Sequence, residues 1–363
     1  MSVLSGKYIL LGITAGIAAY KTAALVRLFI KAGAHVRVIM TPAAKEFITP
    51  LTLSTLSKNP VISSFTDDTD DNAVWNNHVE LGLWADLFVV APATANTLSK
   101  MASGNSDNFL VATYLSAKCP VYFAPAMDLD MHKHPTTKTS IETLKSIGNN
   151  LIPATSGELA SGLVGEGRMA EPEAILEHIE LHVLGQLPLY GKRVLVTAGP
   201  TYEAIDPVRF IGNHSSGLMG FEIANYAAQL GAEVVLITGP THLKAKNSRI
   251  KIVPVMSADE MYTQVHAYFD AVDVAIASAA VADYKPKNAA PSKIKKSAST
   301  LSLELEKTKD ILASIGALKS HQLLVGFALE TNDEVANAIK KLKSKNLDLI
   351  VLNSLNDKGA GFG

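Results

Sequence analysis

The chain has 363 residues, of which 48% are hydrophobic and 18% charged, and its formal net charge at pH 7 is −1. This length exceeds one ordinary hydrophobic core, so we expect two globular domains. The near-zero charge, without basic runs interleaved with aromatic residues, argues against nucleic acid or an anionic membrane as the main partner. A single cysteine, Cys119, excludes an internal disulfide framework and fits a reducing cytoplasm. No stretch reaches the roughly 20 apolar residues that span a bilayer.

The first half of the chain alternates apolar strands with amphipathic helices. Residues 7–11 form a buried strand pattern, and after a glycine-containing turn residues 17–31 form a helical pattern. A second strand follows at 34–40, and such a unit predicts a parallel sheet covered by helices on both faces. The pattern recurs with strands at 87–90 and 121–124 around a helix at 108–117.

The same arrangement restarts near Gly191. Strand, helix and strand are predicted at 193–197, 218–230 and 233–238. Residues 285–300, rich in lysine, proline, serine and alanine, indicate a mobile loop. Further strands are predicted at 274–280, 323–327 and 349–352, with a lysine-rich helix at 335–345.

These patterns predict an α/β protein with two consecutive Rossmann-like domains, each built on a mostly parallel sheet. A closing helix at 175–184 and a short linker place the boundary near residue 188, which gives domains at 1–187 and 188–363. Residues 358–363 have loop composition, without a closing helix or strand. We therefore expect the C-terminal end of the second domain to be incomplete.

Residues 213–220, with the sequence NHSSGLMG, lie between a strand and a helix and indicate a nucleotide site. Ser215 and Ser216 are placed to cap the helix, while Gly217 and Gly220 would let backbone approach a ligand closely. The free N–H groups of a first helical turn carry roughly half a positive charge toward a phosphate. A capped helix without a ligand is the alternative interpretation.

Neither domain has the fingerprint of an NAD site, which needs G-x-G-x-x-G after the first strand and an acidic residue after the second. Residues 12–16 read GITAG, residues 198–201 read AGPT, and the second strands end in Thr-Pro and Gly-Pro. A hydroxyl at Thr14 and a helix start at Gly16 still favour an isolated phosphate, such as that of a mononucleotide flavin.

Ten motifs together carry a resemblance to a known family. In the first half they are 12–21 (GITAGIAAYK), 78–86 (HVELGLWAD), 92–96 (PATAN), 125–127 (PAM) and 165–169 (GEGRM). In the second half they are 213–220, 278–284 (SAAVADY), 293–296 (KIKK), 325–328 (VGFA) and 345–350 (KNLDLI). On these motifs the chain resembles, over essentially its whole length, the bacterial bifunctional phosphopantothenoylcysteine decarboxylase and phosphopantothenate-cysteine ligase of coenzyme A biosynthesis.

The resemblance implies that the first domain decarboxylates phosphopantothenoylcysteine with FMN, which oxidises the substrate thiol and later returns a hydride. His78 matches the family's catalytic histidine, and an imidazole suits proton transfer near neutral pH. A plain strand-to-helix turn, capped by Asn96, is the alternative for residues 92–96. The implied FMN contacts are Thr14, Gly16, Thr41, Pro92, Thr94, Asn96 and Asn108.

Two residues depart from the family pattern. Asp128 stands where the family has an asparagine that contacts the substrate carboxylate, so it must be protonated, paired with a cation or turned away. Ser161 stands where the family has a flap cysteine, and a hydroxyl ionises far less readily than a thiol. Our hypothesis is that Ser161, together with water, still protonates the intermediate, because Cys119 lies at another strand edge and is a poor substitute.

For the second domain the resemblance implies ligation of 4'-phosphopantothenate to cysteine through an acyl-cytidylate made from CTP. Asp283 matches the family's acidic residue, where Mg2+ would neutralise triphosphate charge. Asn213 matches the asparagine that handles the acyl-cytidylate, and Lys293 matches a loop lysine that closes over it. The implied nucleotide contacts are Ala279, Phe327, Lys341 and Lys345, for which ordinary sheet core and solvated surface are the alternatives.

We therefore expect a bifunctional cytoplasmic enzyme with small-molecule substrates and without a nucleic acid or membrane partner. Sites in this family lie between subunits, so the resemblance implies homo-oligomers with trimer contacts in the flavin domain and dimer contacts in the ligase domain. The alternative is an active ligase fused to a flavin-binding or regulatory domain, in which Asp128 and Ser161 impair decarboxylation.

Overall fold

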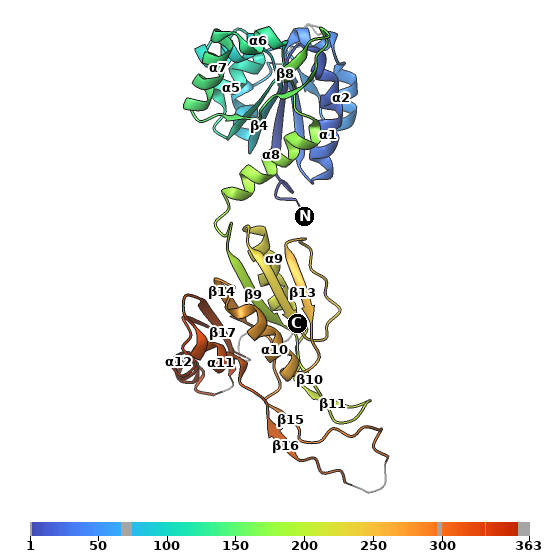
Figure 1. Ribbon diagram of the computed structural model, residues 1–363, viewed down its shortest axis with the longest axis vertical. Coiled ribbons are helices and arrows are strands. Elements are labelled where there is room, and N and C mark those ends of the chain that lie inside the picture. Colours follow the sequence, from blue (N-terminus) through green and yellow to red (C-terminus); the bar gives the residue numbers. More distant parts are fainter. Residues whose placement is uncertain (1, 67–74, 296–299, 331, 355–363) are drawn as a thin grey trace. The chain divides into compact units, whose positions relative to one another are not determined.

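The computed structural model describes residues 2–66, 75–295, 300–330 and 332–354 (Figure 1). The chain divides into two compact units, residues 1–184 and 185–363. Each unit contains a six-stranded sheet in which every neighbouring pair of strands is parallel, so the predicted fold class is confirmed. The predicted chain end at 358–363 and Lys296 of the KIKK motif lie outside the described residues.

The first sheet has the strand order β3-β2-β1-β4-β5-β6. The winding direction reverses between β1 and β4, and at such a reversal the loops that leave the carboxyl ends diverge and leave a crevice. The strands are β1 (Tyr8–Ile13), β2 (His35–Met40), β3 (Val61–Ile62), β4 (Leu87–Ala93), β5 (Val121–Pro125) and β6 (Asn150–Leu151).

Helices cover both faces of the first sheet (Figure 1). Successive strand residues point to opposite faces, so Ile9 and Leu11 pack in one core and Leu10 packs in the other. The first core lies under α1 (Thr22–Lys31), α2 (Pro50–Ser57) and α8 (Pro172–Gly185). The second lies under α3 (His78–Trp84), α4 (Ala95–Ser103), α5 (Phe109–Ser116) and α7 (Pro135–Ser146).

Short helices and one hairpin complete the carboxyl edge of this sheet: η1 (Ile17–Lys21), η2 (Pro42–Glu46), α6 (Leu129–Lys133), and the antiparallel strands β7 (Thr155–Glu158) and β8 (Val164–Arg168). The hairpin is tied to the end of β5, because the Met127 N–H donates to the Gly167 carbonyl at 3.0 Å. Gly167 has φ +155°, and a Cβ there would lie 2.5 Å from the Met127 carbonyl oxygen. Glycine is required at this close approach.

The second sheet repeats the strand order, as β13-β12-β9-β14-β17-β18. Residues 185–192 lead into the amino end of β9, at the edge opposite the carboxyl ends of the strands. The strands are β9 (Arg193–Ala198), β12 (Glu233–Thr238), β13 (Ile250–Pro254), β14 (Val274–Ala277), β17 (Leu323–Glu330) and β18 (Leu349–Ser354).

The helices of the second unit again pack on both faces of its sheet. Val194 of β9 lies in the core under α9 (Leu218–Gln229), and Leu195 lies in the core under α10 (Ala258–Phe269) and α11 (Ile311–Leu318). Helix α12 (Glu334–Ser344) packs on β17 and β18. Two antiparallel ladders extend from the sheet, β10 (Tyr202–Ala204) with β11 (Phe210–Gly212), and β15 (Tyr284–Pro286) with β16 (Leu305–Lys307).

Three element predictions need correction. The helix predicted at 17–31 begins as the 3-10 helix η1 and becomes α-helical at Thr22. The strand predicted at 274–280 ends at Ala277, because the Ser278 hydroxyl then donates to the Thr197 carbonyl and Ala280 pairs with residues 199–201. The loop predicted at 285–300 begins within strand β15, whose backbone pairs with β16.

The expectation for the start of α9 is also wrong in detail. Its N-cap is Gly217, with φ +82°, and no side chain caps the helix. Ser215 and Ser216 instead accept hydrogen bonds from the N–H groups of Gly217 and Leu218, at 3.3 Å each. A Cβ on Gly220 would lie 2.5 Å from the Ala198 Cβ, so a glycine at this position allows close packing of α9 on β9.

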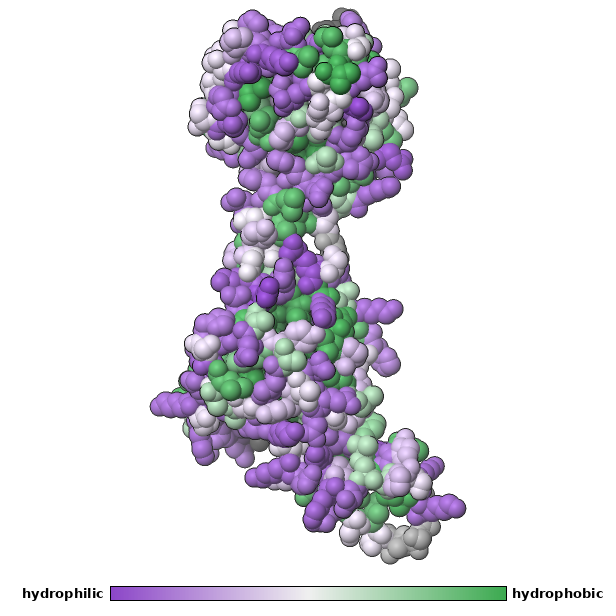
Figure 2. All heavy atoms as spheres, in the orientation of Figure 1, coloured by the Kyte–Doolittle hydropathy of each residue, from purple (hydrophilic) through white to green (hydrophobic). Residues whose placement is uncertain are grey.

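Figure 2 shows hydrophilic side chains over most of the visible face of both units, with smaller hydrophobic patches among them. Within the part of the chain that the structure describes, no helix is both long and apolar enough to cross a bilayer.

Candidate functional sites

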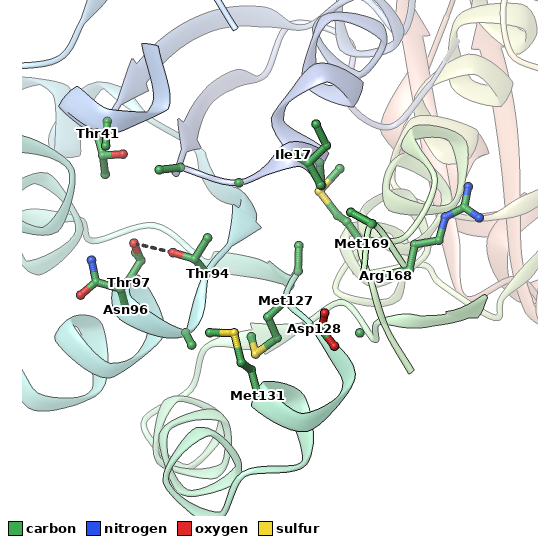
Figure 3. Close-up of a pocket in the computed structure, with 18 of the residues that line it drawn as sticks. Ile17, Thr41, Thr94, Asn96, Thr97, Met127, Asp128, Met131, Arg168 and Met169 are labelled. Atoms are coloured by element: carbon green, nitrogen blue, oxygen red, sulfur yellow. Dashed lines mark hydrogen bonds between the residues drawn. The ribbon is translucent and has the colours of Figure 1, made fainter. Parts of the chain in front are cut away.

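A cavity of about 920 Å³ opens at the carboxyl edge of the first sheet. Its walls are the segments that follow β1, β2, β4 and β5, together with the β7–β8 hairpin (Figure 3). This is the crevice that the reversal between β1 and β4 predicts. The structure brings six predicted site residues to its lining: Gly16, Thr41, Thr94, Asn96, Asn108 and Asp128.

Thr14 and Pro92 lie behind this lining. The buried Thr14 hydroxyl donates to the Pro92 carbonyl at 2.7 Å and accepts from the Thr94 N–H at 3.2 Å. Thr14 therefore fixes the turn between β4 and α4 from within. The N-cap of α4 is Thr94, and Asn96 lies in its first turn, so the alternative in which Asn96 caps the helix is wrong.

The lining contains an unsatisfied polar atom and a helix start. The Thr41 hydroxyl is buried and lacks a hydrogen-bond partner among the described residues. A buried hydroxyl without a partner is costly, so a ligand that bonds to it gains affinity. Residues 94–97, the cap and first turn of α4, also face the cavity, and N–H groups there attract a phosphate. Asn108 caps α5, accepting from the Val111 N–H at 3.1 Å.

Asp128 lies at the cavity wall and forms no ion pair with a described residue. It caps the short helix α6, and its Oδ1 accepts from the Leu129 N–H at 2.6 Å. Arg168 also lines the cavity (Figure 3). Its guanidinium donates to Glu171 at 2.8 Å. No ion pair joins Asp128 to a cation within the described residues, so its carboxylate stays available to a cationic group of a ligand.

Lys21 also lines the cavity, and sequence reasoning assigned it no role. The side chain is only 6% exposed, and its ammonium donates to Glu171 at 2.8 Å and to the Met169 carbonyl at 3.2 Å. The hydrogen bond from Lys21 lowers the pKa of Glu171 from its ordinary value. A lysine on the otherwise apolar face of a predicted helix is the signal that identifies such a residue.

His78 and Ser161 are outside the lining of this cavity. His78 begins α3, its ring centroid lies 5.7 Å from that of Phe65 and 6.5 Å from that of Phe109, and its Nδ1 is buried without a partner among the described residues. Ser161 is exposed at the tip of the β7–β8 hairpin, next to the lining residue Ala160. Burial raises the pKa of the Cys119 thiol to about 11, and Cys119 does not line the cavity.

A second cavity, of about 490 Å³, lies at the carboxyl edge of the second sheet, by the ends of β9, β14 and β17. Its lining includes five predicted site residues, namely Ala279, Asp283, Phe327, Lys341 and Lys345, and two further lysines, Lys307 and Lys309. Lysines that surround a cavity at this edge suit a polyphosphate.

The two predicted lysines of α12 and its end differ in their contacts. The Lys341 ammonium donates to the Phe327 carbonyl at 2.7 Å, and burial, together with neighbouring Lys345, lowers its pKa. Lys345 pairs with Asp310 at 2.9 Å. A partly buried ammonium with a lowered pKa at a cavity wall is typical of a ligand site.

Asn213 and Lys293 are outside the lining of the second cavity. The Asn213 side-chain amide donates to the carbonyl of Val281, a lining residue, at 2.9 Å, so Asn213 lies at the rim. Lys293 is exposed in the segment that follows β15. Within the described residues, no group of three or more His, Cys, Asp or Glu side chains is arranged for a metal ion.

Comparisons with known proteins assign each unit to a family. Residues 2–184 match the Flavoprotein family, and residues 189–363 match the DNA/pantothenate metabolism flavoprotein C-terminal domain. The chain is 45% identical over 363 residues to the coenzyme A biosynthesis bifunctional protein CoaBC of Bacillus subtilis, which covers 99% of this chain and 89% of that protein. The chain belongs to the CoaBC family.

Further relatives extend this comparison. The CoaBC protein of Escherichia coli is 43% identical over 363 residues, 99% of this chain and 89% of that protein. A protein named cysteine/cysteine sulfinic acid decarboxylase, from an unknown prokaryotic organism, is 54% identical over 321 residues, 87% of this chain and 89% of that protein. Among solved structures, the C-terminal domain of a CoaBC protein is 47% identical, with a TM-score of 0.41, and the match covers 46% of this chain and 78% of that chain.

Membership of the CoaBC family relates the two cavities to two kinds of chemistry. The first cavity lies in the Flavoprotein domain, and the start of α4 and the Thr41 hydroxyl, which has no partner in the part of the chain that the structure describes, fit a bound flavin. The second lies in the other CoaBC domain and carries the lysine-rich lining.

Proposed function

We propose that the chain is a bifunctional cytoplasmic enzyme that joins 4'-phosphopantothenate to cysteine with CTP and decarboxylates the product to 4'-phosphopantetheine with FMN. The observation that carries the proposal is that one chain of the CoaBC family has both cavities, each at the carboxyl edge of its own sheet. The comparisons give no support to a purely regulatory flavin domain.

In the ligase half, the substrate carboxylate attacks the α-phosphate of CTP and pyrophosphate leaves. The cysteine amine then attacks the acyl carbon and CMP leaves. Lys341 and Lys345 would stabilise the charge on the phosphates, and Asn213, at the rim, would hold the acyl group. Asp283 would hold Mg2+ together with the triphosphate, which suits an ion that commonly takes one or two carboxylates plus substrate phosphates.

In the decarboxylase half, the Thr41 hydroxyl and the first turn of α4 would hold the FMN. When bound, FMN supplies a reversible two-electron acceptor, which makes loss of CO2 from the oxidised substrate favourable. Gly16, Asn96 and Asn108 also contact the FMN in this proposal, and Thr14 and Pro92 hold the turn behind them in place. Lys21, paired with Glu171 and bonded to the Met169 carbonyl, would fix the segment at residues 169–171 against the cavity wall.

His78 acts as the base on the substrate thiol in this proposal, and a neighbouring copy brings it to the flavin. Three exposed apolar side chains flank it, Trp75 at 57%, Val79 at 44% and Leu83 at 57%. Such a patch is typical of a contact surface. We propose that trimer contacts cover this patch, while the second unit forms dimer contacts. Ser161, on the hairpin, is then the proton donor.

A second candidate substrate for the flavin site is free cysteine. The cysteine nitrogen of phosphopantothenoylcysteine is acylated and uncharged, whereas that of free cysteine is an ammonium that can pair with a carboxylate. Asp128 presents a carboxylate to the cavity that has no ion pair within the described ranges. The relative at 54% identity, named for cysteine and cysteine sulfinic acid, also favours this candidate.

The test gives the purified chain FMN and either phosphopantothenoylcysteine or cysteine, and follows CO2 and products by mass spectrometry. Formation of 4'-phosphopantetheine supports the main proposal, and formation of cysteamine alone replaces it by the second. A parallel assay follows pyrophosphate release with CTP, 4'-phosphopantothenate and cysteine. Absence of CO2 from both substrates would refute the flavin half, and absence of pyrophosphate would refute the ligase half.

A further inference from the structure

A buried carboxylate lies in the turn between β10 and β11, outside both cavities. The side chain of Asp206 is 0% exposed, and that of its partner Arg209 is 39% exposed. Asp206 Oδ1 accepts from the N–H groups of Val208 and Arg209, at 2.8 and 2.9 Å. Asp206 Oδ2 accepts from the Arg209 Nε at 2.9 Å and from the N–H of Ile294 at 3.2 Å. The pair with Arg209 holds the pKa of Asp206 well below its usual range.

The same ion pair binds one distant residue at both of its backbone groups. Asp206 accepts from the Ile294 N–H, and Arg209 Nη2 donates to the Ile294 carbonyl at 2.9 Å. A third bond, from the Ala290 N–H to the Ile205 carbonyl at 2.9 Å, ties the same segment to the same turn. We call Asp206, Arg209 and these backbone bonds the clasp.

The clasp leaves side chains of the held segment free, because it binds only main-chain atoms. Lys293, directly before Ile294, is exposed and has no ion pair among the described residues. An ion pair that is buried gives little net stability, so fixing one arrangement of the chain is its better-supported effect. Here the arrangement fixed is that of residues 290–294.

We propose that Asp206 is a positioning residue for the ligase reaction, which through the clasp sets the place of Lys293. The inference rests on the proposed ligase function and on the role proposed for Lys293. A free segment would have to be ordered in each turnover, and this loss of conformational freedom opposes the reaction. The clasp meets the backbone part of that cost when the protein folds, and the Lys293 side chain stays free to move.

The test compares Asp206→Asn, Lys293→Ala and the double variant in CTP-dependent ligation. We expect Asp206→Asn to lower kcat by about 10- to 100-fold, with the KM for CTP nearly unchanged. Because Asp206 acts through Lys293, the double variant should be no slower than Lys293→Ala. Full kcat in Asp206→Asn, or the same fold-loss in the Lys293→Ala background, would overturn the inference.

Hydrogen exchange separates this inference from the proposed function. In Asp206→Asn the amides of Ala290 and Ile294 should exchange faster, while those of β9 stay protected. Asp273→Asn is the matched control, since Asp273 also accepts a backbone bond, from Arg193 at 2.8 Å, but lies at the amino end of β14 and takes no part in the clasp. If Asp206→Asn does not fold, Arg209→Lys keeps the charge and tests the same bonds. An inactive wild-type chain would refute the ligase proposal, whereas unchanged exchange at Ile294 would refute the clasp.

Discussion

Replacing Gly167 by alanine should open the joint between the β7–β8 hairpin and the wall of the flavin cavity. A Cβ at this position would lie 2.5 Å from the Met127 carbonyl oxygen, and the backbone has φ +155°. The substitution must therefore push residues 127 and 128 away from the hairpin and break the 3.0 Å bond from the Met127 N–H to the Gly167 carbonyl.

Gly162, in the same hairpin, supplies a matched control. Its φ is +82°, and a Cβ there would meet nothing within 4 Å, so Gly162→Ala has only the backbone cost of about 1–2 kcal/mol. Gly167→Ala has a similar backbone cost and an overpacking cost of about 2 kcal/mol in addition. For a unit of this size, that difference corresponds to a Tm about 4–8 °C lower than that of the control.

Calorimetry of the full chain measures the two variants. The transition of the first unit is the one that FMN shifts upward, because a ligand that binds the native state stabilises it. Gly167→Ala should also bind FMN more weakly than Gly162→Ala does in a fluorescence titration, since Asp128 and Met127 line the cavity. Equal Tm values for the two variants would refute the argument from the close approach.

Three further predictions concern single side chains. Thr41→Val should raise the Kd for FMN about fivefold without lowering the Tm of the flavin-free protein, since it removes a buried hydroxyl that has no partner among the described residues. A fluorescence titration measures the Kd and thermal unfolding without FMN measures the Tm, and an unchanged Kd would contradict the prediction. Lys341→Met should raise the KM for CTP about 10-fold in steady-state ligation. Because burial lowers the Lys341 pKa, wild-type affinity for CTP should fall as pH rises through that lowered value, and a flat profile would argue against phosphate contact. Glu171→Gln should lower the stability of the protein at neutral pH. Because the pKa of Glu171 is lowered in the folded state, its stabilising contribution is present above its unfolded pKa and disappears as pH falls through its folded pKa. The Tm values of the wild type and the variant, measured at several pH values, should therefore converge in acid.

Most of the fold is predictable from the sequence because the spacing of apolar residues distinguishes its strands from its helices. Strands such as β12 (Glu233–Thr238) are apolar runs between turn signals, and both sheets need helices on each face. The two-residue edge strands β3 and β6 are too short for a pattern to appear. The early end of β14 depends on a hydroxyl bond from Ser278 to Thr197, which only the folded chain brings together.

The sites were predictable to the extent that their residues follow strand ends. Thr41, Thr94 and Asp128 do so, and they line one cavity. Lys21 was missed, because its burial against Glu171 joins segments about 150 positions apart. His78 lies apart from this cavity within one chain, and no local pattern can show which surface a second copy would cover.

The repeated strand order has a consequence for how such chains can be rearranged. The second cavity lies at the carboxyl edge of its sheet, whereas residues 185–192 enter that sheet at the amino end of β9. A change in the connecting segment therefore alters no residue that lines either cavity. The two halves can therefore be fused, separated or exchanged by changes in the connecting segment alone. Substitutions in one cavity then need no compensating substitutions in the lining of the other.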